Sequence, residues 1–333
     1  MKKKKVSPSR VVIQEFRSRV LKGNPLGDPA VRNLHIYFPP GYSSEKKYPA
    51  LLGLVGLTGT GAMLLNNDTL SEDLKSRLDR LILTKKCKPC IVVLPDCFNR
   101  IGGSQYNNSP AIGNYEDYLV KEIIPFVNQN YPVKSWAVFG KSSGGYGAMV
   151  LGMKYPHIFQ ALADHSGDSN FELCYLPDVP KALDSFREAG GPARWLKKFW
   201  GDENRKRREY FNALNVLAMA AHYSPNPRSK NLKTDFPFDL ETGIFLPEVW
   251  KRWQKWDPVY MIPRYRNNLK KLKLVYIDCG TKDEFALHWG ARAKRKALLK
   301  IRIKPVYREF NDGHMNISYR YDESIPRLVK AIS

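Results

Sequence analysis

The chain has 333 residues, with 54 Lys and Arg against 32 Asp and Glu and a formal net charge of +22. A hydrophobic share of 43% is ample for a folded core, which excludes a chain that is disordered over most of its length. No apolar run approaches the roughly 18–20 residues of a membrane span, and no apolar segment follows the opening lysines as a secretion signal requires. The five cysteines are an odd, sparse set, so we expect a cytoplasmic protein without a membrane partner.

Short apolar runs alternate with amphipathic stretches along most of the chain. The runs predict strands at residues 11–16, 34–38, 50–55, 91–94, 136–139, 161–163, 272–277 and 303–310. Apolar residues at helical spacing predict helices at residues 70–82, 115–127, 144–155, 285–299 and 324–332. This alternation implies an α/β fold with a mostly parallel central sheet and helices on both faces.

Residues 169–262 break the rhythm, since they hold several prolines, a basic run and most of the tryptophans. We therefore predict an α/β core formed by residues 1–168 and 263–333, with residues 169–262 inserted as a tryptophan-rich lid. The lid tryptophans are either anchors that pack the lid onto the sheet or walls of an apolar pocket. Ligands of such sheets bind beyond the carboxyl ends of the strands, so functional residues are expected in the loops that follow them.

The sequence Gly140-Lys141-Ser142-Ser143-Gly144 follows one predicted strand and precedes a helix rich in small residues. This is a G-x-S-x-G pattern, in which a serine on a sharp strand-to-helix turn presents its hydroxyl outward while the glycines permit close backbone approach. Ser142 is the candidate nucleophile. Ser143 is the competing hydroxyl, but it is out of register with the glycines.

A serine hydroxyl needs a base to take its proton, and the base needs an acid to orient it. In a fold of this kind the acid precedes the histidine along the chain. We assign Asp283 as the acid and His314 as the base, because both follow predicted strands that come after the nucleophile. Asp278 and Glu284 are the other candidates for the acid. His165 is the rival base, although it precedes the acid.

An oxyanion that forms on the substrate needs two N–H donors. We predict the backbone N–H groups of Ser143 and of Leu57, which lies in the glycine-rich loop 56–61 after a predicted strand. That loop also suggests a nucleotide cradle, but it matches neither G-x-G-x-x-G nor the phosphate-binding Gly-Lys-Ser/Thr pattern. The polar segment 102–110 is read either as the rim of the pocket or as an ordinary surface loop.

Cys87 and Cys90 form a C-x-x-C pair, but the pair precedes a strand, whereas redox pairs of this type precede a helix. No second pair completes a zinc site, so we read the thiols as incidental and expect no metal.

Most of the excess positive charge lies in residues 1–35 and 263–333. Such charge suits nucleic acid or an acidic lipid surface. We prefer a solvated helix face, because cations recur there among apolar residues at helical spacing: Arg292, Lys294, Arg295, Lys296 and Lys300. We therefore expect no nucleic-acid partner.

The segments that carry the candidate nucleophile, acid, base and oxyanion donors resemble the esterase branch of the α/β-hydrolases. This branch includes esterase D (S-formylglutathione hydrolase), feruloyl and acetyl-xylan esterases, enterochelin esterase and the mycolyltransferases. The resemblance rests on residues 56–60, 140–148, 278–283 and 313–314, and with the framework it covers roughly residues 30–330. It implies an α/β-hydrolase fold and serine-dependent hydrolysis of carboxylic esters or thioesters through an acyl-enzyme, without metal or organic cofactor.

The family's catalytic triad falls on Ser142, Asp283 and His314, and its oxyanion donors fall on Leu57 and Ser143. We therefore expect a serine carboxylesterase that acts on a small-molecule ester, and the sequence is compatible with a homo-oligomer. Formylglutathione hydrolases typically carry a cysteine in the loop that here reads Thr-Gly-Thr at 58–60, which favours the broader carboxylesterase.

Three alternatives stay open. The chain is a thioesterase of the S-formylglutathione hydrolase type, or it transfers the acyl group to another alcohol. From a different class, it is a binding protein on a catalytically retired hydrolase fold, whose basic segments hold nucleic acid or anionic surfaces.

Overall fold

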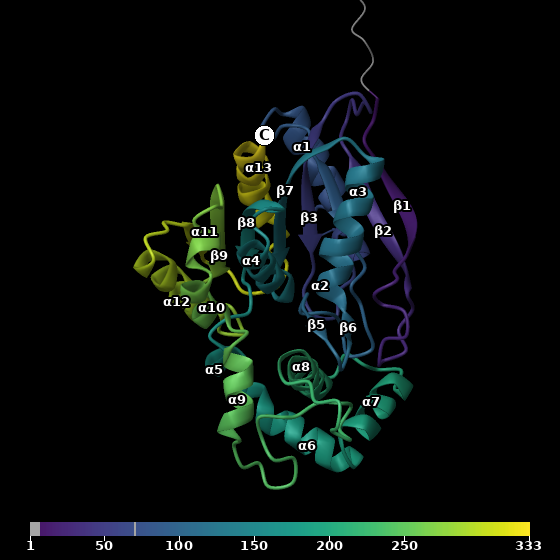
Figure 1. Ribbon diagram of the computed structural model, residues 1–333, viewed down its shortest axis with the longest axis vertical. Coiled ribbons are helices and arrows are strands. Elements are labelled where there is room, and N and C mark those ends of the chain that lie inside the picture. Colours follow the sequence, from purple (N-terminus) through teal and green to yellow (C-terminus); the bar gives the residue numbers. More distant parts are fainter. Residues whose placement is uncertain (1–6, 70) are drawn as a thin grey trace, which may run out of the picture.

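The computed structural model describes residues 7–69 and 71–333. The opening lysines, and Leu70 at the predicted start of one helix, lie outside the described residues. The chain folds around an eight-stranded sheet with the strand order β1-β2-β4-β3-β7-β8-β9-β10 (Figure 1). Strands β1 and β2 are antiparallel to their neighbours, and the remaining pairs are parallel.

The eight strands of this sheet match the predicted ones in number and order. Their bounds are β1 (Arg10–Arg17), β2 (Val31–Phe38), β3 (Tyr48–Leu54), β4 (Ile91–Leu94), β7 (Val133–Lys141), β8 (Phe159–His165), β9 (Leu274–Gly280) and β10 (Val306–Phe310). Strand β10 begins later than predicted, directly after Pro305, which has no N–H to donate to a strand ladder. A small second sheet, not predicted, pairs β5 (Asn108–Ser109) with β6 (Gly113–Asn114).

Helices pack on both faces of the sheet. One face is covered by α1 (Leu74–Leu83) and α13 (Tyr321–Ile332), and the other by α3 (Ile124–Asn130), α4 (Ser143–Lys154) and α12 (Leu287–Lys300). The predicted helix at 115–127 is one helical stretch with a π-turn, made of α2 (Tyr115–Asp117), η2 (Tyr118–Ile123) and α3. Neighbouring residues of β3 point to opposite faces: Leu51 packs with α1 and α13, and Leu52 packs in the larger cluster.

The segment between β8 and β9 is largely helical. It contains α5 (Phe171–Cys174), α6 (Val179–Ala189), α7 (Pro192–Gly201), α8 (Arg208–Tyr223), α9 (Pro247–Gln254), α10 (Pro258–Arg264) and α11 (Arg266–Leu269). Helices α6 to α9 lie together at one end of the sheet (Figure 1). The division into a core and a lid stays a prediction, because one apolar cluster takes in residues of both parts, such as Leu162 and Ala218.

The tryptophans of this segment mainly anchor it. Trp195, Trp250 and Trp253 are buried in the same apolar cluster as the sheet, in contact with other aromatic rings. Trp256 is partly buried and packs against this cluster, whereas Trp200 has 39% of its surface exposed. The packing therefore favours anchors over pocket walls for the buried three.

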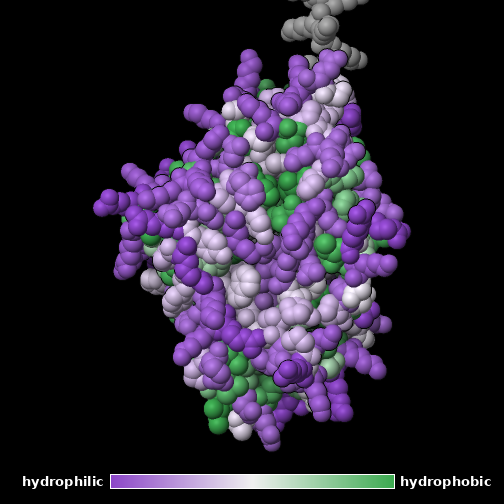
Figure 2. Space-filling model, viewed as in Figure 1, coloured by the Kyte–Doolittle hydropathy of each residue, from purple (hydrophilic) through white to green (hydrophobic). Residues whose placement is uncertain are grey.

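Most of the molecular face shown in Figure 2 is hydrophilic, with smaller hydrophobic areas between the polar side chains. Among the described residues, each helix is too short or too polar to cross a membrane.

One residue of the predicted solvated helix face is buried instead. Lys294 is 0% exposed, its ammonium pairs with the buried Asp164 carboxylate, and it donates to the carbonyl oxygen of Gly167 at 3.0 Å. The prediction is wrong for Lys294 because it shares the inward stripe of α12 with Leu287 and Leu298. The Lys294 ammonium can be buried there because it pairs with the Asp164 carboxylate.

We expect the substitution Lys294→Met to lower the free energy of unfolding by about 3–5 kcal/mol, because it leaves the Asp164 carboxylate buried without its counter-charge. Lys296→Met, on the exposed side of the same helix, is the control and should change it by less than about 0.5 kcal/mol. Urea unfolding followed by circular dichroism measures both. Equal stability of the two variants would contradict a structural role for the buried pair.

Candidate active site

Ser142 occupies a strained turn between β7 and α4. Its backbone angles are φ 60° and ψ −128°, which non-glycine residues rarely adopt. Its N–H donates to the carbonyl oxygen of His165 at 2.9 Å, and its own carbonyl accepts the first helical bond, from Tyr146 at 2.9 Å. The turn is therefore held by hydrogen bonds on both sides, and the half-buried Ser142 side chain lines a cavity.

Two glycines allow the elements around the turn to approach so closely. A Cβ atom at Gly140 would overlap the carbonyl group of Gly144, and a Cβ atom at Gly144 would overlap the carbonyl group of Leu54 in β3. Both positions thus require glycine, as the G-x-S-x-G pattern predicts.

Asp283 and His314 come together from the loops after β9 and β10. His314 Nδ1 lies 2.7 Å from Asp283 Oδ2, and both side chains are buried. Asp283 Oδ1 accepts the backbone N–H groups of Phe285 at 3.0 Å and Leu287 at 3.4 Å. Burial opposes ionisation of Asp283, but the hydrogen bond from His314 and the two N–H groups outweigh it and lower the pKa of Asp283.

The histidine is itself positioned by its neighbours. The backbone N–H of His314 donates to Glu284 Oε2 at 2.6 Å, and the edge of the Phe285 ring packs against the imidazole with a centroid separation of 4.8 Å. Glu284 therefore holds the backbone of His314, whereas Asp283 holds its ring.

Ser142 and His314 line the same cavity, of about 320 Å³, together with Leu57, Ser143 and Phe285. We call it the active-site cavity. A methyl group placed on Gly56 would lie 3.1 Å from Cβ of Ser142, so the loop 56–61 runs directly beside the candidate nucleophile. The structure thus brings a hydroxyl, an imidazole and a flanking loop to one place at the carboxyl ends of the strands.

The two candidate oxyanion donors line this cavity. Among the described residues no acceptor takes the N–H of Leu57, whereas the N–H of Thr58 is taken by the carbonyl oxygen of Gly102. Ser143 is the first residue of α4, where an N–H has no acceptor within the helix. Both groups are therefore available to a negatively charged oxygen, and the helix N-terminus favours that charge.

Sequence reasoning missed Asp168, which also lines the active-site cavity. Its carboxylate accepts hydrogen bonds from the hydroxyls of Ser143 at 3.0 Å and Tyr175 at 2.9 Å. Gln105 Nε2 donates to the Ser143 hydroxyl at 2.7 Å, so that hydroxyl both donates and accepts a hydrogen bond. Burial raises the pKa of Asp168, against the lowering effect of its two hydroxyl donors. Its place in the loop after β8, at the predicted functional edge, was the available signal.

Segment 102–110 is not an ordinary surface loop. Tyr106 donates to the carbonyl oxygen of Val55, and Ser109 donates to that of Ala221 in α8. The segment is mostly buried and ties the loop beside the nucleophile to α8, so the reading as an ordinary surface loop is wrong. Gly102 lines a cavity beside the active-site cavity, and the reading as a rim stays a prediction.

The rival acid and base pair with each other, away from the cavity. His165 Nδ1 lies 2.6 Å from Asp278 Oδ1, and His165 Nε2 lies 2.8 Å from the hydroxyl of Ser324 in α13. Arg320 and the hydroxyl of Tyr276 also donate to Asp278. All three members of this Asp–His–Ser relay are buried, so it joins α13 to the sheet.

Comparison with known proteins places this geometry in context. A family described as "Putative esterase" matches residues 29–315, most of the chain. An S-formylglutathione hydrolase of Mus musculus is 25% identical over 160 residues, which are 42% of this chain and 52% of the mouse protein. The match thus spans about half the length of that relative.

Two solved structures resemble the whole chain. A ferulic acid esterase superposes with a TM-score of 0.63 at 18% identity, covering 98% of this chain and 99% of the other. An S-formylglutathione hydrolase from Agrobacterium tumefaciens superposes with a TM-score of 0.59 at 16% identity, covering 98% and 96%. The predicted α/β-hydrolase fold is confirmed.

We expect the substitution Asp283→Asn to lower the free energy of unfolding at pH 7 by about 1.5–3 kcal/mol, the range for hydrogen bonds to a charged group. Because the pKa of Asp283 is lower in the folded chain than its ordinary value of 3.8, the stability it supplies is present above about pH 4 and is lost as the pH falls through the lower, folded value. Urea unfolding between pH 7 and pH 3 should show the difference between the two proteins shrinking toward acid. A difference that stays constant over this range would contradict the assignment.

Proposed function

Because the chain belongs to the "Putative esterase" family, we propose that it is a serine ester hydrolase with Ser142 as nucleophile, His314 as general base and Asp283 as the acid that orients the base. The observation that carries this proposal is the buried His314–Asp283 pair, which opens onto the same cavity as the strained Ser142 turn. Geometry of this kind recurs on unrelated folds in enzymes that use a serine nucleophile.

The proposed reaction starts with proton transfer. His314 takes the proton of the Ser142 hydroxyl as its oxygen attacks the carbonyl carbon of the ester, and Asp283 stabilises the imidazolium that results. The N–H groups of Leu57 and Ser143 hold the oxyanion of the tetrahedral intermediate. That intermediate collapses, the bond to the alcohol oxygen breaks, and His314 gives its proton to the departing alcohol.

A second half-reaction restores the enzyme. Water attacks the acyl group on Ser142 while His314 takes its proton, and the carboxylic acid leaves with the serine hydroxyl reprotonated. The aromatic side chains of Phe211, Phe285 and Tyr175 line the cavity and supply apolar contacts for the substrate. No step needs a metal or an organic cofactor.

We expect Ser142→Ala to lower kcat/KM for 4-nitrophenyl acetate by about a thousandfold or more, because the attacking oxygen is gone. Ser143→Ala is the matched comparison: it removes a hydroxyl one residue away but keeps the nucleophile and the backbone N–H. That variant should still be labelled covalently by a fluorophosphonate probe, whereas Ser142→Ala should not. Labelling of Ser142→Ala at the wild-type rate would refute the assignment of the nucleophile.

A thioesterase acting on S-acyl-glutathione is the second candidate, favoured by the similarity to the mouse S-formylglutathione hydrolase. A true thioesterase should show a kcat/KM for S-formylglutathione at least about a hundredfold above that for methyl formate or another short formyl ester. Equal values would favour the broader carboxylesterase, and both substrates should depend on Ser142.

A further inference from the structure

A second cavity, of about 590 Å³, adjoins the active-site cavity. Thr58 and Phe211 line both, so the two meet beside the predicted oxyanion loop. Its wall carries three neighbouring cations, for which we call it the basic cavity: Arg205, Lys206 and Arg207.

These cations are exposed, and Arg205 and Arg207 lie over the rings of Trp200 and Tyr210. No ion pair of the described residues involves any of the three. Glu203 also lines the cavity, so its lining carries three positive charges against one negative. The excess of positive charge is local to the basic cavity, because the neighbouring active-site cavity is lined by the Asp168 carboxylate as well as by Lys141.

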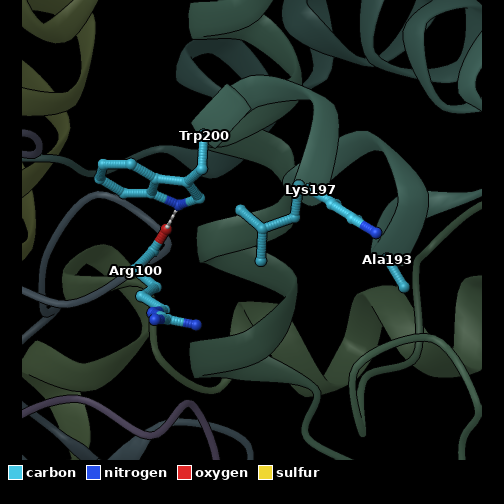
Figure 3. Close-up of a pocket in the computed structure, with 5 residues that line it drawn as sticks. Arg100, Ala193, Lys197 and Trp200 are labelled. Carbon is cyan, nitrogen blue, oxygen red and sulfur yellow. Dashed lines mark hydrogen bonds between the residues drawn. The ribbon is translucent and has the colours of Figure 1, made fainter. Parts of the chain in front are cut away.

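The floor of the basic cavity is aromatic and held in place. Trp200 donates its indole N–H to the carbonyl oxygen of Arg100 at 2.8 Å, as Figure 3 shows. The guanidinium carbon of Arg205 lies 5.1 Å from the centroid of the indole ring, and Phe98 meets that ring edge-on at 6.4 Å. The aromatic wall thus holds the Arg205 guanidinium over the indole, so that this cation is kept beside the cavity.

Trp200 also lines a further cavity that carries positive charge. This cavity, of about 550 Å³, is lined by Arg100 and Lys197 as well (Figure 3). An anionic group that contacts Trp200 from either cavity therefore lies near cations.

We propose that the ester hydrolysed at Ser142 carries an anionic group, a carboxylate or a phosphate, that lies in the basic cavity beyond Thr58 and Phe211. This inference rests on the proposed hydrolase function and names the class of substrate for it. Cations along the path to a reacting centre raise the rate of encounter and the affinity for an anion, and salt weakens the effect where the charges are exposed. Arg205 and Arg207 also offer paired N–H donors that match a planar carboxylate or a phosphate.

The test compares pairs of esters in which a neutral substituent replaces an anionic one. On the alcohol side, the pairs are 4-acetoxybenzoate against its methyl ester and 4-acetoxyphenyl phosphate against 4-acetoxyanisole, which separate carboxylate from phosphate. On the acyl side, mono-4-nitrophenyl glutarate is compared with 4-nitrophenyl valerate. We expect the wild-type protein to prefer the anionic member of at least one pair by about tenfold or more in kcat/KM at low salt, with the preference falling as NaCl rises to 0.5 M.

Charge reversal locates the effect. The double variant Arg205→Glu with Lys206→Glu should lose the preference through a higher KM, while kcat/KM for 4-nitrophenyl acetate stays within about twofold of wild type. The control is Lys296→Glu with Lys300→Glu, which makes the same change in net charge at exposed positions of α12 that line none of these cavities. It should keep the preference.

Three results would overturn the inference. The first is equal turnover of the charged and neutral members of every pair, and the second is a preference that survives in the Arg205/Lys206 variant. The third is an equal loss of the preference in the α12 control, because that result would assign the preference to the overall charge of the protein. Turnover of neutral esters alone would leave the hydrolase proposal intact. Failure to turn over any ester, with no fluorophosphonate labelling of Ser142, would refute the proposed function and this inference with it.

Discussion

The architecture of the site depends on one tight backbone crossing. Strand β7 ends, turns at Ser142 and enters α4 so close to β3 that Gly140 and Gly144 have no room for a side chain. The positive φ of Ser142 is sustained because its N–H and carbonyl groups are both bonded. Since the turn is set by backbone contacts in the centre of the sheet, the backbone of Ser142 is held independently of the side chains that line the cavity.

Much of this site could be predicted from the sequence, because strand ends are readable and parallel strands bring their carboxyl ends together. Apolar runs before Ser142, Asp283 and His314 predict that all three lie at one edge of the sheet, and they do. Asp283 is preferred to Asp278 because it lies in a predicted loop, whereas Asp278 lies in or at the edge of a predicted strand. This difference in position decides where each side chain can reach. A residue inside β9 points into the sheet packing, whereas a loop residue can turn toward the cavity.

Other features could not be predicted, because they depend on partners distant in sequence. Lys294 has the spacing of the buried stripe of α12, but its charge favours exposure, and only Asp164, far away in the chain, explains why a cation is buried there. Asp168 and Gln105 meet at Ser143 from separate segments. The segment 102–110 looks polar in sequence, yet its polar groups are bonded inside the protein, so composition alone gives the wrong exposure.

The relay of Asp278, His165 and Ser324 links the loop of Asp283 to a distant helix. Asp278 lies on β9 shortly before Asp283, and Ser324 belongs to α13. The strand that leads into the loop of Asp283 therefore has all of its buried hydrogen-bond partners only while α13 is docked on the sheet, although no described residue of α13 itself lines the active-site cavity.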